Sequence, residues 1–189
     1  MKQPLTTELL VMAYSNGWFP MSESRGDDQI NWYQPKVRGI IPLDGFRMSK
    51  NVMRLIRRGG YEVTVDRSFE RVMRLCAERD ETWISDEIIR AYTQLQKDGY
   101  AHSVEIWRND ELIGGLYGVS LRKAFFGESM FHKEPEMDKV ALWHCHDLLL
   151  KGGYTLWDTQ FYTEHLGRFG CIEIGHKAYM KHLKSALSR

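Results

Sequence analysis

A stretch rich in strand-forming residues spans 111–131, with the sequence ELIGGLYGVSLRKAFFGESMF. Aliphatic and aromatic residues fill 112–119 and 124–131, and the basic pair Arg122-Lys123 separates the two segments. Strand formers on both sides of a polar connection predict two antiparallel strands joined by a tight turn. Glycine weakens a strand, so three glycines in the first segment indicate a bulge or a ligand held close to bare backbone. They are Gly114, Gly115 and Gly118.

Around these two strands, the hydrophobic pattern switches between the periods of helices and strands. It predicts helices at 5–15, 50–58, 67–78, 86–98, 139–151 and from about 177 onward, with a single helical turn after 160. It predicts strands at 61–65, 100–108, 154–160 and 171–174. Antiparallel strands followed by an alternation of helix and strand predict an α+β fold, with an antiparallel-rich mixed sheet flanked by helices.

The segment 16–35 carries no regular period and is interpreted as a loop whose aromatic residues anchor it to the core. This segment ends near Gln34-Pro35, where the chain composition changes. We therefore expect a small N-terminal lobe at 1–35 and a larger catalytic domain at 36–189.

The composition is that of a soluble globular protein, with 43% hydrophobic and 27% charged residues among 189. No apolar run approaches the ~20 residues of a membrane helix, and the N-terminus lacks the apolar region of a signal peptide. Three cysteines without a CxxC motif favour free thiols in a reducing compartment. We expect a cytoplasmic protein that does not associate with a membrane.

The net charge of +1 hides an uneven distribution of basic residues. At ~100° per residue, the predicted helix 50–58 places its basic side chains on one stripe and its aliphatic side chains opposite. The basic residues are Lys50, Arg54, Arg57 and Arg58. Most such stripes are simply solvated, but no acidic residue lies between Arg47 and Arg58 to neutralise this one. The absence of acidic partners favours a site for a polyanion.

Three polar residues occur within otherwise apolar strand segments. Glu128 lies in the run FFGESMF, where a carboxylate is costly unless it is paired or faces a wet cleft. Asp158 and Gln160 are two apart on a predicted strand, so both are expected on one face of the sheet. The pattern alone leaves two interpretations open: a buried polar network that fixes the register, or a site built on a glycine-rich sheet.

Several kinds of chemistry are disfavoured by the sequence. His144 and His146 are two apart on a predicted helix and point to different sides, so no metal site is expected. Ser129 lacks the second glycine of a nucleophile elbow, and no phosphate-binding glycine loop is present. An acyl-CoA enzyme needs such a loop before the helix at 139–151, but the chain has the acidic segment HKEPEMD at 132–138.

Six motifs occur in order from about Tyr14 to Tyr179: NGWFPM, ETWI, HSVEIW, GGLYGV, GESMF and DTQ. Together they resemble the leucyl/phenylalanyl-tRNA–protein transferases. The resemblance implies a fold similar to the GCN5-related N-acetyltransferases. It also implies transfer of Leu, Phe or Met from aminoacyl-tRNA to the α-amino group of proteins beginning with Lys or Arg, which marks them for degradation. Since an aminoacyl ester is already activated, we expect no cofactor, metal or ATP.

The resemblance also implies roles for the three polar residues. Gln160 is expected to accept a hydrogen bond from the attacking amine, while Asp158 holds the side-chain amide of Gln160 in an aspartate–glutamine relay. Glu128 is expected at the same cleft, where its carboxylate would attract the Arg or Lys of the acceptor.

The donor's side chain is expected in an apolar pocket. Positions that match family pocket residues are Leu116, Phe125, Met130, Trp157 and Cys145. Trp83 matches a tryptophan that stacks near the terminal adenosine of the tRNA, and the basic stripe at 50–58 matches the family's tRNA-binding cluster. Trp157 stands where a smaller aliphatic residue can occur, so a narrower pocket is expected to accept Leu at least as well as Phe.

Two alternatives remain at this point: a non-catalytic tRNA-binding module, and an acyl-CoA-dependent N-acyltransferase. The module would retain the basic stripe but would not need Asp158 and Gln160. The partners expected for the enzyme are Leu- or Phe-tRNA and acceptor proteins with N-terminal Lys or Arg, bound by a monomer.

Overall fold

The computed structural model describes residues 4–26, 29–79 and 81–188. Seven of its strands form one sheet with the order β4-β5-β6-β7-β8-β3-β9, in which only the pair β7 and β8 is parallel. The strands are β3 (Val37–Ile40), β4 (Glu62–Val65), β5 (Ala101–Arg108), β6 (Glu111–Leu121), β7 (Ala124–His132), β8 (Leu156–Gln160) and β9 (Ile172–Gly175). The prediction of an antiparallel-rich mixed sheet in an α+β fold is therefore confirmed.

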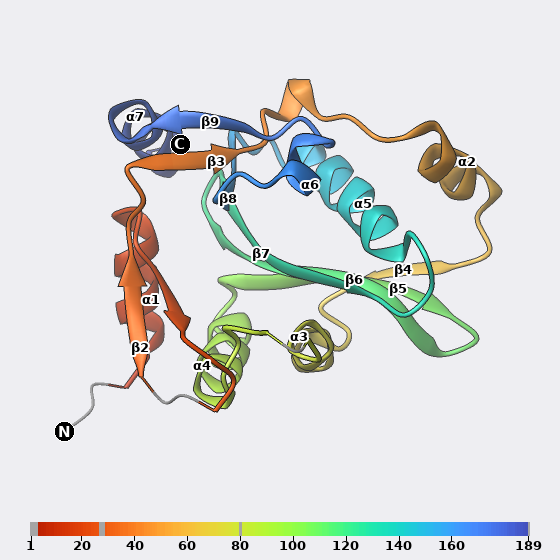
Figure 1. Ribbon diagram of the computed structural model, residues 1–189, viewed down its shortest axis with the longest axis horizontal. Helices are drawn as coiled ribbons and strands as arrows, with labels where there is room; N and C mark the ends of the chain where they lie inside the picture. The colour runs from red at the N-terminus through yellow and green to blue at the C-terminus, as the bar shows by residue number, and fades with distance from the viewer. Residues whose placement is uncertain (1–3, 27–28, 80, 189) are drawn as a thin grey trace.

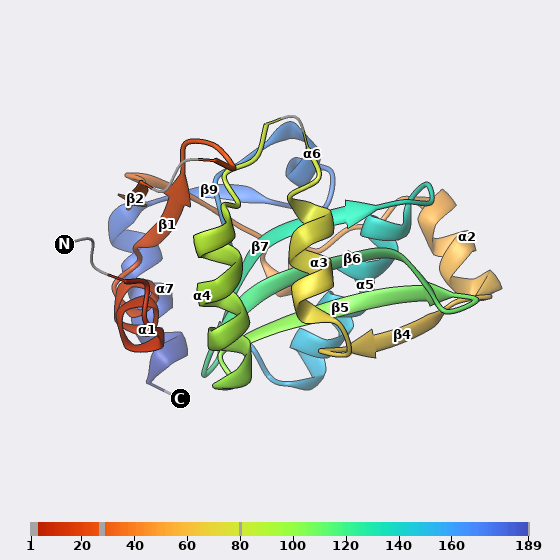
Figure 2. The ribbon, with the colours of Figure 1, turned by 90° about the horizontal axis from the view of Figure 1, so that it is seen from below.

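Helices cover both faces of this sheet (Figures 1 and 2). One face carries α5 (Met137–Lys151), and the opposite face carries α3 (Phe69–Cys76) and α4 (Asp86–Lys97). The others are α1 (Thr7–Ser15), α2 (Lys50–Arg58), the short α6 (Glu164–Gly167), α7 (His176–Leu187) and the 3₁₀ turn η1 (Leu43–Gly45). Two hydrophobic clusters result, one on each face of the sheet.

The predicted helices and strands agree with the structure at most positions. Ser49 caps α2 by accepting from the Val52 amide, and Ser85 caps α4 in the same way from Ile88. At the β5–β6 turn, Asn109 and Asp110 both have positive φ, as a type I′ turn requires.

The prediction that 16–35 is a loop is wrong. Phe19–Ser22 (β1) pairs with Ile30–Tyr33 (β2) as a two-stranded sheet, and β3 follows in a segment for which no strand was predicted. These strands have only four residues each, too few for a recognisable alternation, and their stability comes from long-range packing. Leu10, Tyr14 and Phe19 share a hydrophobic cluster with residues of α3 and α4. The division into a lobe at 1–35 and a domain at 36–189 stays a prediction.

The glycines of β6 serve packing. The register between β6 and β7 shifts at Tyr117/Gly118, which is the bulge that the sequence indicated. A Cβ atom at Gly118 would lie 2.4 Å from the Phe125 ring, and one at Gly114 would lie 2.5 Å from the Met137 Cβ. The close neighbours of these two glycines are therefore parts of the chain, and their small size lets α5 and β7 approach the strand.

Candidate active site

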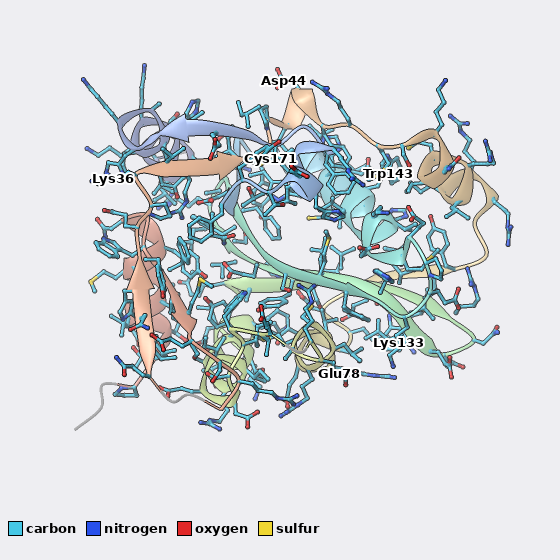
Figure 3. The ribbon with its side chains drawn as sticks, viewed as in Figure 1. Lys36, Asp44, Glu78, Lys133, Trp143 and Cys171 are labelled. Atoms are coloured by element: carbon cyan, nitrogen blue, oxygen red, sulfur yellow. The ribbon has the colours of Figure 1, made fainter. Side chains whose placement is uncertain are left out.

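A cavity of about 570 Å³ lies where β7 and β8 separate. Residues Ala124–Phe126 of β7 pair with residues Leu156–Asp158 of β8. Beyond these residues the two backbones diverge. The walls come from β6, β7 and β8, from α5, from the segment around α6 and from the end of α3. Glu78, labelled in Figure 3 just after α3, belongs to the wall on the α3 side. We refer to this space as the central cavity.

Glu128 lies on β7 at the point of divergence and lines the central cavity. Its Oε1 atom accepts two hydrogen bonds, from the Tyr14 hydroxyl at 2.6 Å and from the side-chain nitrogen of Gln160 at 2.9 Å. Withdrawal of the carboxyl from bulk water raises its pKa to about 8, although the bond from Tyr14 opposes this shift. At neutral pH both protonation states of Glu128 are therefore populated.

Asp158 lies beneath the cavity surface and is fully buried. Arg38, itself buried, donates to both carboxylate oxygens at 2.9–3.1 Å, and the Tyr179 hydroxyl donates at 2.6 Å. The Arg38 guanidinium also packs over the ring of Phe19 at 4.8 Å and the ring of Tyr179 at 4.5 Å. Asp158 is thus the centre of a buried ion-pair network that joins β8 to β3 and α7.

Gln160 is the last residue of β8 and has a left-handed backbone, with φ of +59°. Its backbone N–H donates to Asp158 Oδ1 at 2.7 Å, whereas its side-chain amide donates to Glu128. The expectation that Asp158 holds the side-chain amide of Gln160 is therefore wrong. The carboxylate of Asp158 is instead paired with Arg38. The positive φ of Gln160 turns its side chain toward Glu128 and the cavity.

The residues that support this group were not predicted from the sequence. Tyr14 is fully buried on α1 and is hydrogen-bonded both to Glu128 and to the hydroxyl of Tyr92 on α4. Burial, the nearby Glu128 and Tyr92 together raise the pKa of Tyr14 well above its usual value, so it acts as a hydrogen-bond donor. Arg38 lies on the unpredicted strand β3. The only sequence signal for it was a basic residue within the apolar run VRGII.

Four of the five residues predicted for the donor pocket line the central cavity: Leu116, Phe125, Met130 and Trp157. Cys145 does not. It is buried within the cluster between α5 and the sheet, and Leu142, one helical turn earlier, lines the cavity in its place. The turn of α5 that faces the cavity was misjudged because both residues belong to the same apolar stripe. Trp83 lies in the cavity wall before α4, and its adenosine-stacking role stays a prediction.

The basic stripe lies on α2 (Figure 1), and no residue of this helix lines the central cavity. All four of its residues are exposed, while Val52 on the opposite side of the helix is buried. This arrangement confirms the predicted amphipathic orientation of the helix. His144 and His146 make separate contacts, with Tyr61 and with the Leu43 carbonyl. None of the described helices combines the length and apolar character needed to cross a lipid bilayer.

Comparison with known proteins places these observations in a family. A family model described as leucyl/phenylalanyl-tRNA protein transferase matches residues 40–184, and a model of its N-terminal domain matches residues 3–36. The chain belongs to the leucyl/phenylalanyl-tRNA–protein transferase family. A member from Ruegeria sp. (strain TM1040) is 50% identical over 185 residues, which cover 98% of this chain and 88% of the relative. A member from Gloeobacter violaceus is 49% identical over 97% of this chain and 95% of the relative.

Among solved structures, the chain is similar to the crystal structure of FemX, with a TM-score of 0.55 over 89% of this chain and 66% of FemX. Sequence identity to FemX is 13%, so this likeness concerns the fold alone. Membership of the family makes the chain an aminoacyltransferase of the tRNA–protein class.

Proposed function

We propose that the protein transfers Leu, Phe or Met from aminoacyl-tRNA to the α-amino group of proteins that begin with Lys or Arg. Glu128 and Gln160 form its catalytic group at the wall of the central cavity, and Asp158 supports this group from beneath the cavity surface. The observation that carries this proposal is the direct hydrogen bond between Glu128 and Gln160 at the wall of a cavity whose other walls are mainly apolar. Such a space suits an aliphatic or aromatic donor side chain beside a reacting polar group.

Each of the three residues would have a separate task. The side-chain carbonyl of Gln160 accepts a hydrogen bond from the attacking amine, because its side-chain N–H already donates to Glu128. Asp158 is a positioning residue that fixes the Gln160 backbone. Glu128, with a pKa of about 8, matches the pKa of an α-amino group near 8 and is therefore suited to accept its proton.

The donor would lie with its side chain between β6, β7 and β8, against Leu116, Phe125, Met130 and Trp157. Trp157 is almost fully buried and is stacked on Phe46 with ring centroids 5.6 Å apart, so it is a rigid wall. A rigid indole limits the pocket depth and supports the expectation that Leu is accepted at least as well as Phe. The terminal adenosine would stack on Trp83, and the tRNA backbone would contact the four basic residues of α2.

The acyl-CoA alternative is disfavoured by the connection between β7 and α5. Coenzyme A phosphates would need a positive helix N-terminus there, but Glu134, Glu136 and Asp138 occupy this position. The non-catalytic module is disfavoured by the polar group, because tRNA binding alone does not require a glutamate with a raised pKa in an apolar cavity. We place the enzyme in the cytoplasm as a monomer that marks its acceptors for degradation.

The proposal is tested by mixing the purified protein with radiolabelled Leu-tRNA and a peptide that begins with Arg. We expect leucine to be attached to the α-amine, as located by mass spectrometry, and no product from the same peptide with an acetylated N-terminus. The matched pair of variants is Gln160→Ala, in the cavity, and Gln94→Ala, exposed on α4. The first should lower single-turnover transfer at least 100-fold, and the second should leave it unchanged.

Binding of Leu-tRNA without any transfer would favour the module. Transfer from acetyl-CoA to the peptide in place of transfer from Leu-tRNA would favour the acyl-CoA enzyme. Asp158→Ala is a less informative variant than Gln160→Ala, because loss of Asp158 leaves Arg38 buried without its partner and would confuse lost chemistry with lost folding.

A further inference from the structure

A second carboxylate, Asp138 in the first turn of α5, lines the central cavity and is 7% exposed. Its Oδ2 atom lies 3.2 Å from His132 Nδ1 at the end of β7. Its Oδ1 atom is buried and has no hydrogen-bond partner among the residues that the structure describes. A buried carboxylate oxygen without a donor is costly, and a bound group that supplies a hydrogen bond would remove that cost.

The surroundings of Asp138 favour a cation as that group. The positive end of α5 stabilises the ionised carboxylate. Lys139, the next residue in the chain, is already paired with Glu136, and Arg108 at the end of β5 is paired with Glu134. Burial lowers the pKa of His165 in the same wall, although Asp138 opposes the shift, so this imidazole is largely neutral at pH 7. The chain itself therefore leaves Asp138 Oδ1 open to an external donor.

Glu128 is the less suitable partner for a side-chain cation. Its Oε1 atom already accepts from Tyr14 and Gln160, and at neutral pH much of it is protonated. A protonated carboxyl offers little to a guanidinium, whereas an ionised one forms a charge-assisted bond. The recognition of charge and the handling of the proton are thus separated between two carboxylates of one cavity.

Glu128 and Asp138 lie toward opposite ends of the stretch of β7 that lines the central cavity. Glu128 and His132 are four residues apart on β7, or roughly 13 Å along the strand, and Asp138 contacts His132. Met130 lies between them and also lines the cavity. An α-amine held at Glu128 and Gln160 would place the methylene groups of Arg or Lys along Met130, with the charged end near Asp138. The donor's own α-amine lies beside the ester carbon and would not reach so far.

We propose that Asp138 is the specificity residue that recognises the cationic side chain of the acceptor's N-terminal Arg or Lys. This inference rests on the proposed function and locates its acceptor subsite at the start of α5.

The test compares peptides that begin with Arg or with citrulline, which has nearly the shape of arginine but no charge. We expect Asp138→Asn to reduce the Arg-over-citrulline ratio of kcat/KM by about 10- to 100-fold, the range of one charge-assisted hydrogen bond. The KM for Leu-tRNA should not change. Asp147→Asn is the matched control, because Asp147 lies on the same helix outside the cavity and pairs with Lys151. It should keep the ratio of the unaltered enzyme.

An unchanged ratio in Asp138→Asn overturns the inference, as does a ratio that collapses in Glu128→Gln alone. A raised KM for Leu-tRNA with an unchanged ratio would assign Asp138 to the donor, which also overturns it. If the unaltered enzyme shows transfer but no preference for Arg, the proposed acceptor class fails. If it shows no transfer, the proposed reaction fails.

A second measurement needs no variant. Carbodiimide coupling of a peptide with N-terminal Lys to the unaltered protein should join the lysine side-chain amine to Asp138, as mapped by mass spectrometry. Coupling of that amine to Glu128 in place of Asp138 would overturn the inference even if Asp138→Asn did not fold.

Discussion

Replacement of Glu128 by Gln should make the stability of the protein less sensitive to pH. The amide of Gln retains an oxygen that can accept the bonds from Tyr14 and Gln160, so the substitution removes the titration while keeping the contacts. The comparison therefore isolates one ionisable group within a network that stays otherwise intact.

The direction and size of this pH dependence follow from the raised pKa of Glu128. The carboxyl titrates near 4.5 when unfolded and near 8 when folded, so the folded state holds the proton more tightly. The contribution of Glu128 to the free energy of unfolding is fully present below pH 4.5 and is lost as pH rises through 8. At 1.36 kcal/mol per pKa unit the shift corresponds to roughly 5 kcal/mol, and screening by water in the cavity reduces this to about 2–4 kcal/mol.

The assay is urea unfolding followed by tryptophan fluorescence at intervals between pH 5 and pH 9. The free energy of unfolding of the unaltered protein, minus that of Glu128→Gln, should fall by about 2–4 kcal/mol across this range. Glu111→Gln, at an exposed strand end, should give a flat difference. A difference for Glu128→Gln that stays within ~0.5 kcal/mol, or that rises with pH, would refute the assignment of a raised pKa.

Three further predictions follow from other parts of the structure. Asp158→Ala should lower the free energy of unfolding by about 3–5 kcal/mol in urea at pH 7, because Arg38 stays buried without its carboxylate; a loss under ~1 kcal/mol would contradict the ion-pair network. Replacing the four basic residues of α2 by Gln should reduce the slope of log affinity for tRNA against log salt by about 3–4; an unchanged slope would place the tRNA elsewhere. Trp83→Ala should weaken Leu-tRNA binding by about 1–3 kcal/mol, with the single-turnover rate at saturation retained; a lower saturated rate with unchanged binding would argue against stacking.

Much of the fold could be predicted because its local signals agree with its packing. Helix α2 has a serine cap, a single apolar side and a glycine stop, and each is visible in the sequence. The β5–β6–β7 meander was similarly clear. In contrast, β1, β2 and β3 are only four residues long, and the strand partners of β3 lie near the other end of the chain, so no local pattern identified these strands.

In the candidate site, too, some features could be predicted from the sequence and others could not. Glu128, Asp158 and Gln160 could be selected because polar residues in apolar strands are unusual. Their contacts could not be predicted, because these depend on Arg38 and on the positive φ of Gln160. The place of Cys145 was misjudged for a related reason: the apolar stripe of a helix does not reveal which of its turns faces a cavity.

The network around Asp158 also has a consequence for biosynthesis. Its carboxylate is held by a residue 120 positions earlier and by another 21 positions later. Such long-range contacts form late, since both distant segments must first be brought together. A nascent chain that has not yet released Tyr179 from the ribosome would therefore lack an assembled catalytic centre, and C-terminal truncations that remove α7 should abolish transfer even though every cavity-lining residue is retained.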